Sequence, residues 1–137
     1  MNWKLELVLL PVADVDRAKT YYTETLGFRL DVDHHPSATF RVVQMTPPGS
    51  ACSVSIGLGL TDAAPGSVRG LHLVVSDIEA ARATLVARGA AVGSIFHFDD
   101  GQQAEGADPT RRDYGSFFSF NDPDGNSWVV QEVAHST

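Results

Sequence analysis

Two stretches of this sequence, Leu7–Ala18 (LVLLPVADVDRA) and Gly70–Ala81 (GLHLVVSDIEAA), carry the same pattern. In each stretch an apolar run is followed by polar residues and then by apolar residues at helical spacing. Asp14 is a preferred N-cap, because its side chain accepts a hydrogen bond from an amide of the first helical turn. In the second copy, Ser76–Glu79 has the spacing of a capping box. Each copy therefore predicts a buried strand, a capped turn and an amphipathic helix.

Three further strands are predicted after each helix. The helices end at Gly27 and Gly89, where glycine adopts a left-handed conformation at little cost. The predicted fold class is α+β, with a first βαβββ module over residues 1–62 and a second over 63–137, within a single domain of residues 1–137. The expected strands are Leu5–Val12, Phe28–Val32, Phe40–Met45 and Cys52–Leu60, then Leu71–Val75, Ala91–Phe98, Tyr114–Phe120 and Ser127–Val133.

Composition excludes several classes of function. The chain has 137 residues and a net charge of −7, and its ten Lys and Arg residues are scattered. We therefore expect no nucleic-acid partner, because phosphate contacts need clustered basic residues. No apolar run approaches the roughly 18 residues of a membrane helix, and the N-terminus lacks the apolar region of a signal peptide. We expect a cytoplasmic protein with no membrane partner. The single cysteine, Cys52, excludes an internal disulfide.

The order of the motifs resembles the vicinal oxygen chelate superfamily, which includes glyoxalase I, bleomycin-resistance proteins and extradiol dioxygenases. The resemblance rests on Pro11–Asp14 leading to Leu26–Phe28, on Leu73–Asp77 leading to Ala87–Gly89, and on Asp122–Asn126. It implies two modules whose strands form a curled mixed sheet, or cup, with the helices on the outer face. It also implies a homodimer. It specifies no reaction, because this fold carries several.

The resemblance also implies where a metal would be bound. The family's metal enzymes hold a divalent ion with His and Glu side chains. Here Leu7, Gly70 and Val129 occupy three of those positions, and a fourth falls near Ser55 or Ile56. Leucine, glycine and valine side chains cannot bind a metal ion. We therefore predict no metal and no other cofactor, the alternative being a divalent metal held by displaced ligands.

His72 is the most informative titratable residue. It lies two positions after Gly70, so its side chain is predicted to face the cup. Gln131 lies two positions after Val129 and is predicted to face the cup for the same reason. His72 is either a catalytic acid or base, or a core histidine whose two nitrogens are hydrogen-bonded. Glu132 has the opposite parity to Gln131 and is predicted to point outward.

Aromatic and basic residues supply the other predicted ligand contacts. Phe117 and Phe118 point to opposite faces of a strand, so at least one of them lines the cup. Arg41 either points to solvent or binds a carboxylate in the cup. The polar segment 99–113 is either a lid that brings Arg111, Arg112 or Tyr114 to a ligand, or a disordered surface loop. The predicted ligand-binding residues are Leu7, Arg41, Ser55, His72, Phe98, Tyr114, Phe118, Val129 and Gln131.

Two functions from different classes fit these observations. The first is a metal-free protein that binds a small, partly aromatic molecule, such as an antibiotic, in the cup. The second is an enzyme of the same superfamily: a lyase, an isomerase or a dioxygenase. Such an enzyme is either metal-dependent through displaced ligands or metal-free, with His72 as acid or base.

Overall fold

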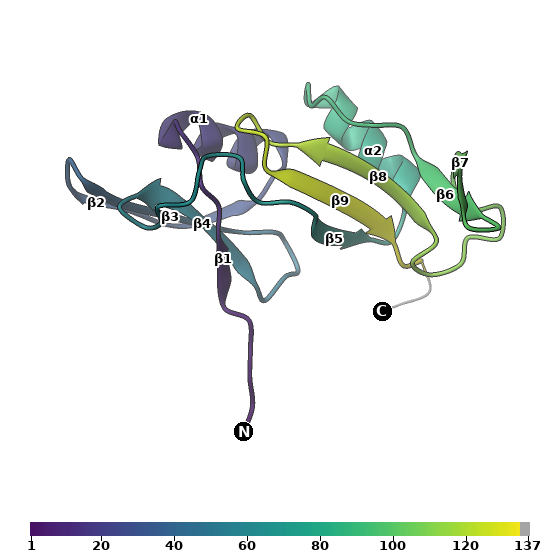
Figure 1. Ribbon diagram of the computed structural model, residues 1–137, viewed down its shortest axis with the longest axis horizontal. Helices are drawn as coiled ribbons and strands as arrows, with labels where there is room; N and C mark the ends of the chain where they lie inside the picture. Colours follow the sequence, from purple (N-terminus) through teal and green to yellow (C-terminus); the bar gives the residue numbers. More distant parts are fainter. Residues whose placement is uncertain (135–137) are drawn as a thin grey trace. The chain divides into compact units, whose positions relative to one another are not determined.

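The computed structural model describes residues 1–134 and has an α+β fold with two βαβββ-like modules (Figure 1). The fold class predicted from the repeated motif is confirmed. The chain forms two compact units, each with its own hydrogen-bonded sheet. The first unit contains residues 1–68 together with 122–126, and the second contains residues 69–121 and 127–134. Within residues 1–134, no helix is both long and apolar enough to cross a membrane.

In the first unit, the helix covers one face of a four-stranded sheet of order β1-β4-β3-β2. Strand β1 pairs in parallel with β4, and the other pairs are antiparallel. Val43, Met45 and Ile56 point toward the helix and are fully buried. The elements are β1 (Leu7–Leu9), α1 (Val15–Thr20), the π-helical turn η1 (Tyr21–Thr25), β2 (Arg29–Ser37), β3 (Phe40–Thr46) and β4 (Ser53–Leu58).

Strand β2 continues through residues 34–37, beyond the end of the predicted strand Phe28–Val32. Its pairing with β3 extends as far as Ser37 opposite Phe40, with register shifts on the way. Because β2 is the edge strand, Pro36 can lie in it without the loss of a hydrogen bond inside the sheet. The predicted ends of the helix are confirmed: Asp14 accepts a hydrogen bond from the Arg17 amide, and Gly27 has a φ of 79°.

In the second unit, helix α2 covers one face of a five-stranded sheet of order β5-β9-β8-β6-β7. The side chains on this face are the large buried ones of β8 and β9, among them Phe118, Phe120 and Trp128. The elements are β5 (Leu71–Val75), α2 (Ile78–Ala87), β6 (Phe96–Asp99), β7 (Gln102–Glu105), β8 (Ser116–Asn121) and β9 (Ser127–Glu132).

The polar segment 99–113 is ordered in this structure, so it is not the disordered loop that the sequence offered as one alternative. Residues 102–105 form β7, which pairs with β6 as a hairpin. The remainder folds around Asp108, whose buried carboxylate accepts hydrogen bonds from the Arg112 side chain (2.7 Å) and from the amides of Thr110 and Arg112. Arg112 and these amides hold the pKa of Asp108 below its usual range. The missed strand has too few apolar residues to show a period.

The helix cap of the second unit also differs from the predicted capping box. The N-cap is Asp77, whose carboxylate accepts hydrogen bonds of 3.1 Å from the amides of Glu79 and Ala80. Glu79 instead forms an ion pair with Arg111. The equivalent aspartates of the two copies, Asp14 and Asp77, are therefore both helix N-caps.

The Asp122–Asn126 turn, which joins β8 to β9, packs in the first unit. The Asp122 carboxylate accepts a hydrogen bond from the Tyr22 hydroxyl at 2.7 Å. Asn126 donates to the carbonyl of Pro11 at 3.0 Å, and the Ala13 amide donates to Asp124 at 2.9 Å. The turn predicted from the sequence is therefore also a structural element of the other half of the chain.

Candidate functional site

The candidate site lies on the face of the second unit's sheet opposite α2. Side chains of directly paired residues point to the same face of a sheet. His72 pairs with Val129, and Phe117 pairs with both Gln131 and Phe96. These five side chains therefore share one surface, which we call the aromatic face. His72, Val129 and Gln131, all predicted from strand parity, are brought together there.

Three phenylalanines form the centre of the aromatic face. The rings of Phe96 and Phe117 stack with their centroids 5.5 Å apart, and Phe98 meets each of them edge-on at 5.8 Å. Phe98 is 49% exposed and Phe117 is partly exposed. Grouped aromatic rings that keep contact with water are typical of binding surfaces.

Phe118, one of the predicted ligand-binding residues, lies on the other face of the sheet. It is fully buried on the α2 side, where its side chain is part of the core. Phe117, its neighbour in the sequence, is the residue of β8 that reaches the aromatic face. Alternation along the strand predicts that the two residues differ in this way, and only the position of the helix decides which one is covered.

A cavity of about 340 Å³ opens beside Phe96. This volume is within the range that holds small molecules. Its lining combines an aromatic ring, a carboxylate and neutral hydrogen-bonding groups. The lining residues are Gly93, Ser94, Ile95, Phe96, Gln103, Ala104, Glu105 and Ser119.

His72 has one ring nitrogen engaged. Its Nδ1 lies 2.6 Å from the carbonyl oxygen of Gly70. Because a carbonyl only accepts, we assign the proton of the neutral ring to Nδ1, which leaves the lone pair on Nε2. The side chain is exposed on the aromatic face. The geometry therefore allows Nε2 to accept a hydrogen bond or a proton from a bound molecule.

In the first unit, Leu7 and Ser55 lie on the sheet face opposite α1. The register pairs Leu7 with Ser53 and Leu9 with Ser55. Ser55 is buried, and its Oγ has no hydrogen-bond partner within residues 1–134. It lines a cavity of about 40 Å³ with Leu9 and Leu10. That space fits a water-sized molecule rather than a larger ligand.

Arg41 lies on the face of its sheet that α1 covers. Its guanidinium donates to Asp33 from Nε (3.1 Å) and Nη2 (2.9 Å), and to Asp16 from Nη1 (2.8 Å). The sequence predicted that Arg41 points to solvent or binds the carboxylate of a ligand. In the structure it binds two aspartates of its own unit instead. Arg41 and Lys19 hold the pKa of Asp33 well below its usual range.

Acid should weaken the Asp33 ion pairs. A folded-state pKa below the ordinary value of about 4 stabilises the protein above that value, and the contribution is lost as the pH falls. We expect the Tm of the wild type to fall more steeply between about pH 5 and pH 3 than that of Asp33→Asn. Thermal melts over this range test the expectation, with Asp62→Asn as the exposed control. Equal slopes for wild type and Asp33→Asn would contradict it.

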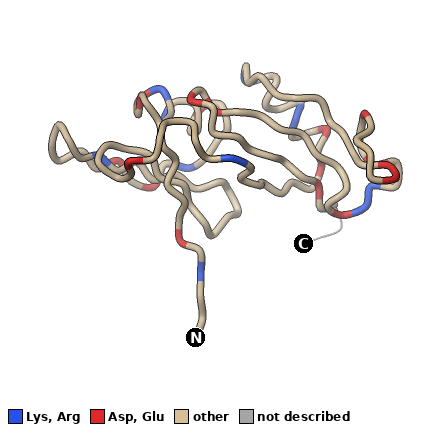
Figure 2. Tube along the Cα trace, viewed as in Figure 1, with Lys and Arg blue, Asp and Glu red and all other residues tan. Residues whose placement is uncertain are grey.

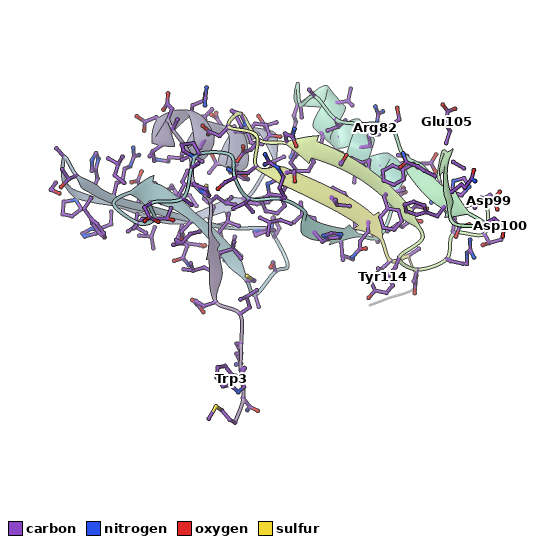
Figure 3. The ribbon with its side chains drawn as sticks, in the orientation of Figure 1. Trp3, Arg82, Asp99, Asp100, Glu105 and Tyr114 are labelled. Carbon is purple, nitrogen blue, oxygen red and sulfur yellow. The ribbon has the colours of Figure 1, made fainter. Side chains whose placement is uncertain are left out.

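The loop between β7 and β8 contains Arg111, Arg112 and Tyr114, the residues that a lid was predicted to bring to a ligand. Tyr114 is 60% exposed, and its amide donates to the carbonyl of Glu132 at 2.8 Å (Figure 3). Arg111 forms ion pairs with Glu79 and Glu132, and Arg112 forms one with Asp108. Both guanidinium groups therefore form ion pairs with carboxylates of their own unit.

The residues at the expected metal-ligand positions do not fit a divalent metal. Leu7 and Val129 have apolar side chains, and Gly70 has none. In the part of the chain that the structure describes, residues 1–134, no three His, Cys, Asp or Glu side chains are grouped to hold a metal ion. Displaced ligands are therefore not found among these residues.

Sequence reasoning missed Phe96, Glu105 and Ser119. Phe96 has the same strand parity as Phe98, so alternation along the strand could have identified it. Ser119 shares the parity of Phe117 in the same way. Glu105 lies in the polar segment, where no periodic pattern indicates a strand, so no signal in the sequence placed it beside Phe96.

Comparison with known proteins identifies relatives along nearly the whole chain. Residues 4–130 match the Glyoxalase/Bleomycin resistance protein/Dioxygenase superfamily. TnmS3, an antibiotic binding protein from Streptomyces sp. CB03234, is 32% identical with a TM-score of 0.74, covering 96% of each chain. A glyoxalase/bleomycin resistance protein from the same organism is 32% identical with a TM-score of 0.71, over 94% of this chain and 100% of that chain. No curated protein matches the sequence.

A further similar structure is a member of the same superfamily from Sphaerobacter thermophilus DSM 20745. It is 26% identical with a TM-score of 0.75, over 96% of this chain and 98% of that chain. The similarity thus extends over both modules rather than over one motif.

Proposed function

Since this chain belongs to the glyoxalase/bleomycin resistance protein/dioxygenase superfamily, we propose that it binds a small, partly aromatic molecule without a metal ion. The observation that carries the proposal is the group of three packed rings, Phe96, Phe98 and Phe117, on the aromatic face. Partly exposed rings next to a cavity of ligand size can stack on a planar molecule. The antibiotic-binding relative TnmS3 supports a binding function of this class.

Replacing Phe117 tests the proposal, because its ring contacts both of the other phenylalanines. We expect Phe117→Ala to weaken binding of the neutral tricyclic probe acridone about tenfold, through lost stacking and lost apolar burial. Fluorescence titration measures the dissociation constant. The matched control is Phe40→Ala, because Phe40 is a partly exposed phenylalanine of the first unit. Failure of the wild type to bind any planar aromatic probe, or equal effects of the two variants, would contradict the proposal.

A second candidate function is a metal-free enzyme that uses His72. The observation in its favour is the Nδ1 contact with Gly70, which leaves Nε2 able to accept a proton. The same binding experiment separates the two functions, because a binding protein returns its ligand unchanged. A ligand that is converted by the wild type, and is bound but not converted by His72→Ala, would support the enzyme.

A further inference from the structure

The cavity beside Phe96 has one charged lining residue, Glu105. Its neutral hydrogen-bonding groups come from Ser94, Gln103 and Ser119. The surrounding sequence is also acidic, since residues 89–110 contain four Asp or Glu residues and no Lys or Arg. Asp99, Asp100 and Glu105 belong to the β6–β7 hairpin, where Figure 2 shows acidic positions in red. A molecule in this cavity therefore meets a negative electrostatic field.

Glu105 is positioned by the register of the hairpin. It pairs with Phe96, so its side chain lies beside that ring on the same face of the sheet. Figure 3 shows Glu105 at one end of β7, and Asp99 and Asp100 at the turn of the hairpin at the other end. Within residues 1–134, Glu105 takes part in none of the ion pairs. Its negative charge is therefore available to a ligand.

Basic side chains also reach this region, and Arg112 forms an ion pair with Asp108, one of the four acidic residues. Arg82 of α2 donates its Nε–H to the carbonyl of Gly93 at 2.8 Å, and Gly93 lines the cavity. Arg82 itself is not among the lining residues. Its charge reduces the negative field in the cavity without supplying a contact for an anion. Glu105 remains the charged group that a bound molecule touches.

We propose that the ligand of the aromatic face is a planar aromatic cation whose positive charge lies next to Glu105. This inference rests on the proposed function and names the ligand class of the same site. An aromatic ring attracts a cation through its negative face, and an adjacent carboxylate adds a direct charge interaction. A neutral aromatic molecule gains only the stacking, and an anionic one is repelled by Glu105.

Three planar tricyclic probes of different charge test the inference: the proflavine cation, neutral acridone and the anthraquinone-2-sulfonate anion. We expect the wild type to bind proflavine about tenfold more tightly than acridone, and the sulfonate most weakly. Titrations at low and high salt should show the preference for proflavine decreasing as salt is added.

Glu105→Gln is the decisive variant, because it keeps the size of the side chain and removes its charge. We expect it to weaken proflavine binding about fivefold and to leave acridone binding unchanged. Asp100→Asn is the matched control, since it removes an equal charge from the turn of the same hairpin, and asparagine tolerates the positive φ of that position. Thermal melts check that both variants are folded.

The outcomes separate this inference from the proposed function. Binding of acridone with no preference for proflavine would overturn the inference and leave the proposed function standing. A preference that Glu105→Gln does not reduce, or that Asp100→Asn reduces equally, would also overturn the inference. Absence of binding for all three probes would overturn both.

Discussion

Asp122→Ala is expected to lower the free energy of unfolding by about 3 to 4 kcal/mol. The Asp122 carboxylate is buried and accepts hydrogen bonds from the Tyr22 hydroxyl (2.7 Å) and from the backbone amides of Asp124 and Asn126 (both 2.9 Å). It also accepts one from the Asn126 side chain at 2.9 Å. Alanine leaves these donors without their acceptor, and an unsatisfied buried donor costs about 1 to 3 kcal/mol.

Urea denaturation measures this loss, and two variants show its origin. Tyr22→Phe removes a single donor and is expected to cost about 1 kcal/mol. Asp62→Ala removes an exposed aspartate of the same unit and is expected to change stability by less than about 0.5 kcal/mol. If Asp122→Ala cost no more than Tyr22→Phe, the hydrogen bonds from the backbone amides of the turn would contribute nothing to stability, contrary to this prediction.

The sequence predicted the fold because the same local rules apply twice. Asp14 and Asp77 cap the helices, and the glycines that follow the helices end them. The Asp122–Asn126 motif was recognisable as a turn, but its position in the first unit depends on contacts with Tyr22 and Pro11. Such contacts join residues a hundred or more positions apart, so no local pattern encodes them.

The alternation of side chains along the strands predicted only part of the candidate site. His72, Val129 and Gln131 share a face because alternation is a property of the strand itself. Parity cannot say which face a helix covers, and for this reason Phe118 was predicted to contact ligand although Phe117 does so in our proposal. Arg41 is a similar case, since its partners Asp16 and Asp33 come from α1 and β2.

Glu132→Ala is expected to lower the free energy of unfolding by about 2 to 3 kcal/mol. Parity predicted correctly that Glu132 lies on the face opposite to Gln131, but that face is covered by α2, so the residue is fully buried rather than exposed. Its Oε2 accepts hydrogen bonds from the Ile78 amide (2.9 Å) and the Arg111 side chain (2.8 Å). Alanine would leave a buried amide at the helix N-terminus without an acceptor.

The size of the stability loss in Glu132→Ala depends on the second carboxylate oxygen of Glu132 and on the backbone conformation of Arg111. Glu132 Oε1 has no hydrogen-bond partner within residues 1–134, so part of the cost of burying the carboxylate is uncompensated in the wild type. Arg111 has a φ of 48°, a conformation that costs energy in a residue other than glycine and that its ion pairs help to hold. Faster hydrogen exchange at the amides of Ile78 and residues 111–114 should therefore accompany the loss of stability.

Glu79→Ala is the matched control, because it removes the exposed carboxylate from the same arginine. We expect it to cost less than about 1 kcal/mol, since exposed ion pairs contribute little. Glu132→Gln retains an acceptor for the Ile78 amide and should fall between the two alanine variants. A loss in Glu79→Ala as large as that in Glu132→Ala would assign the effect to the Arg111 ion pairs and not to the buried carboxylate at the start of α2.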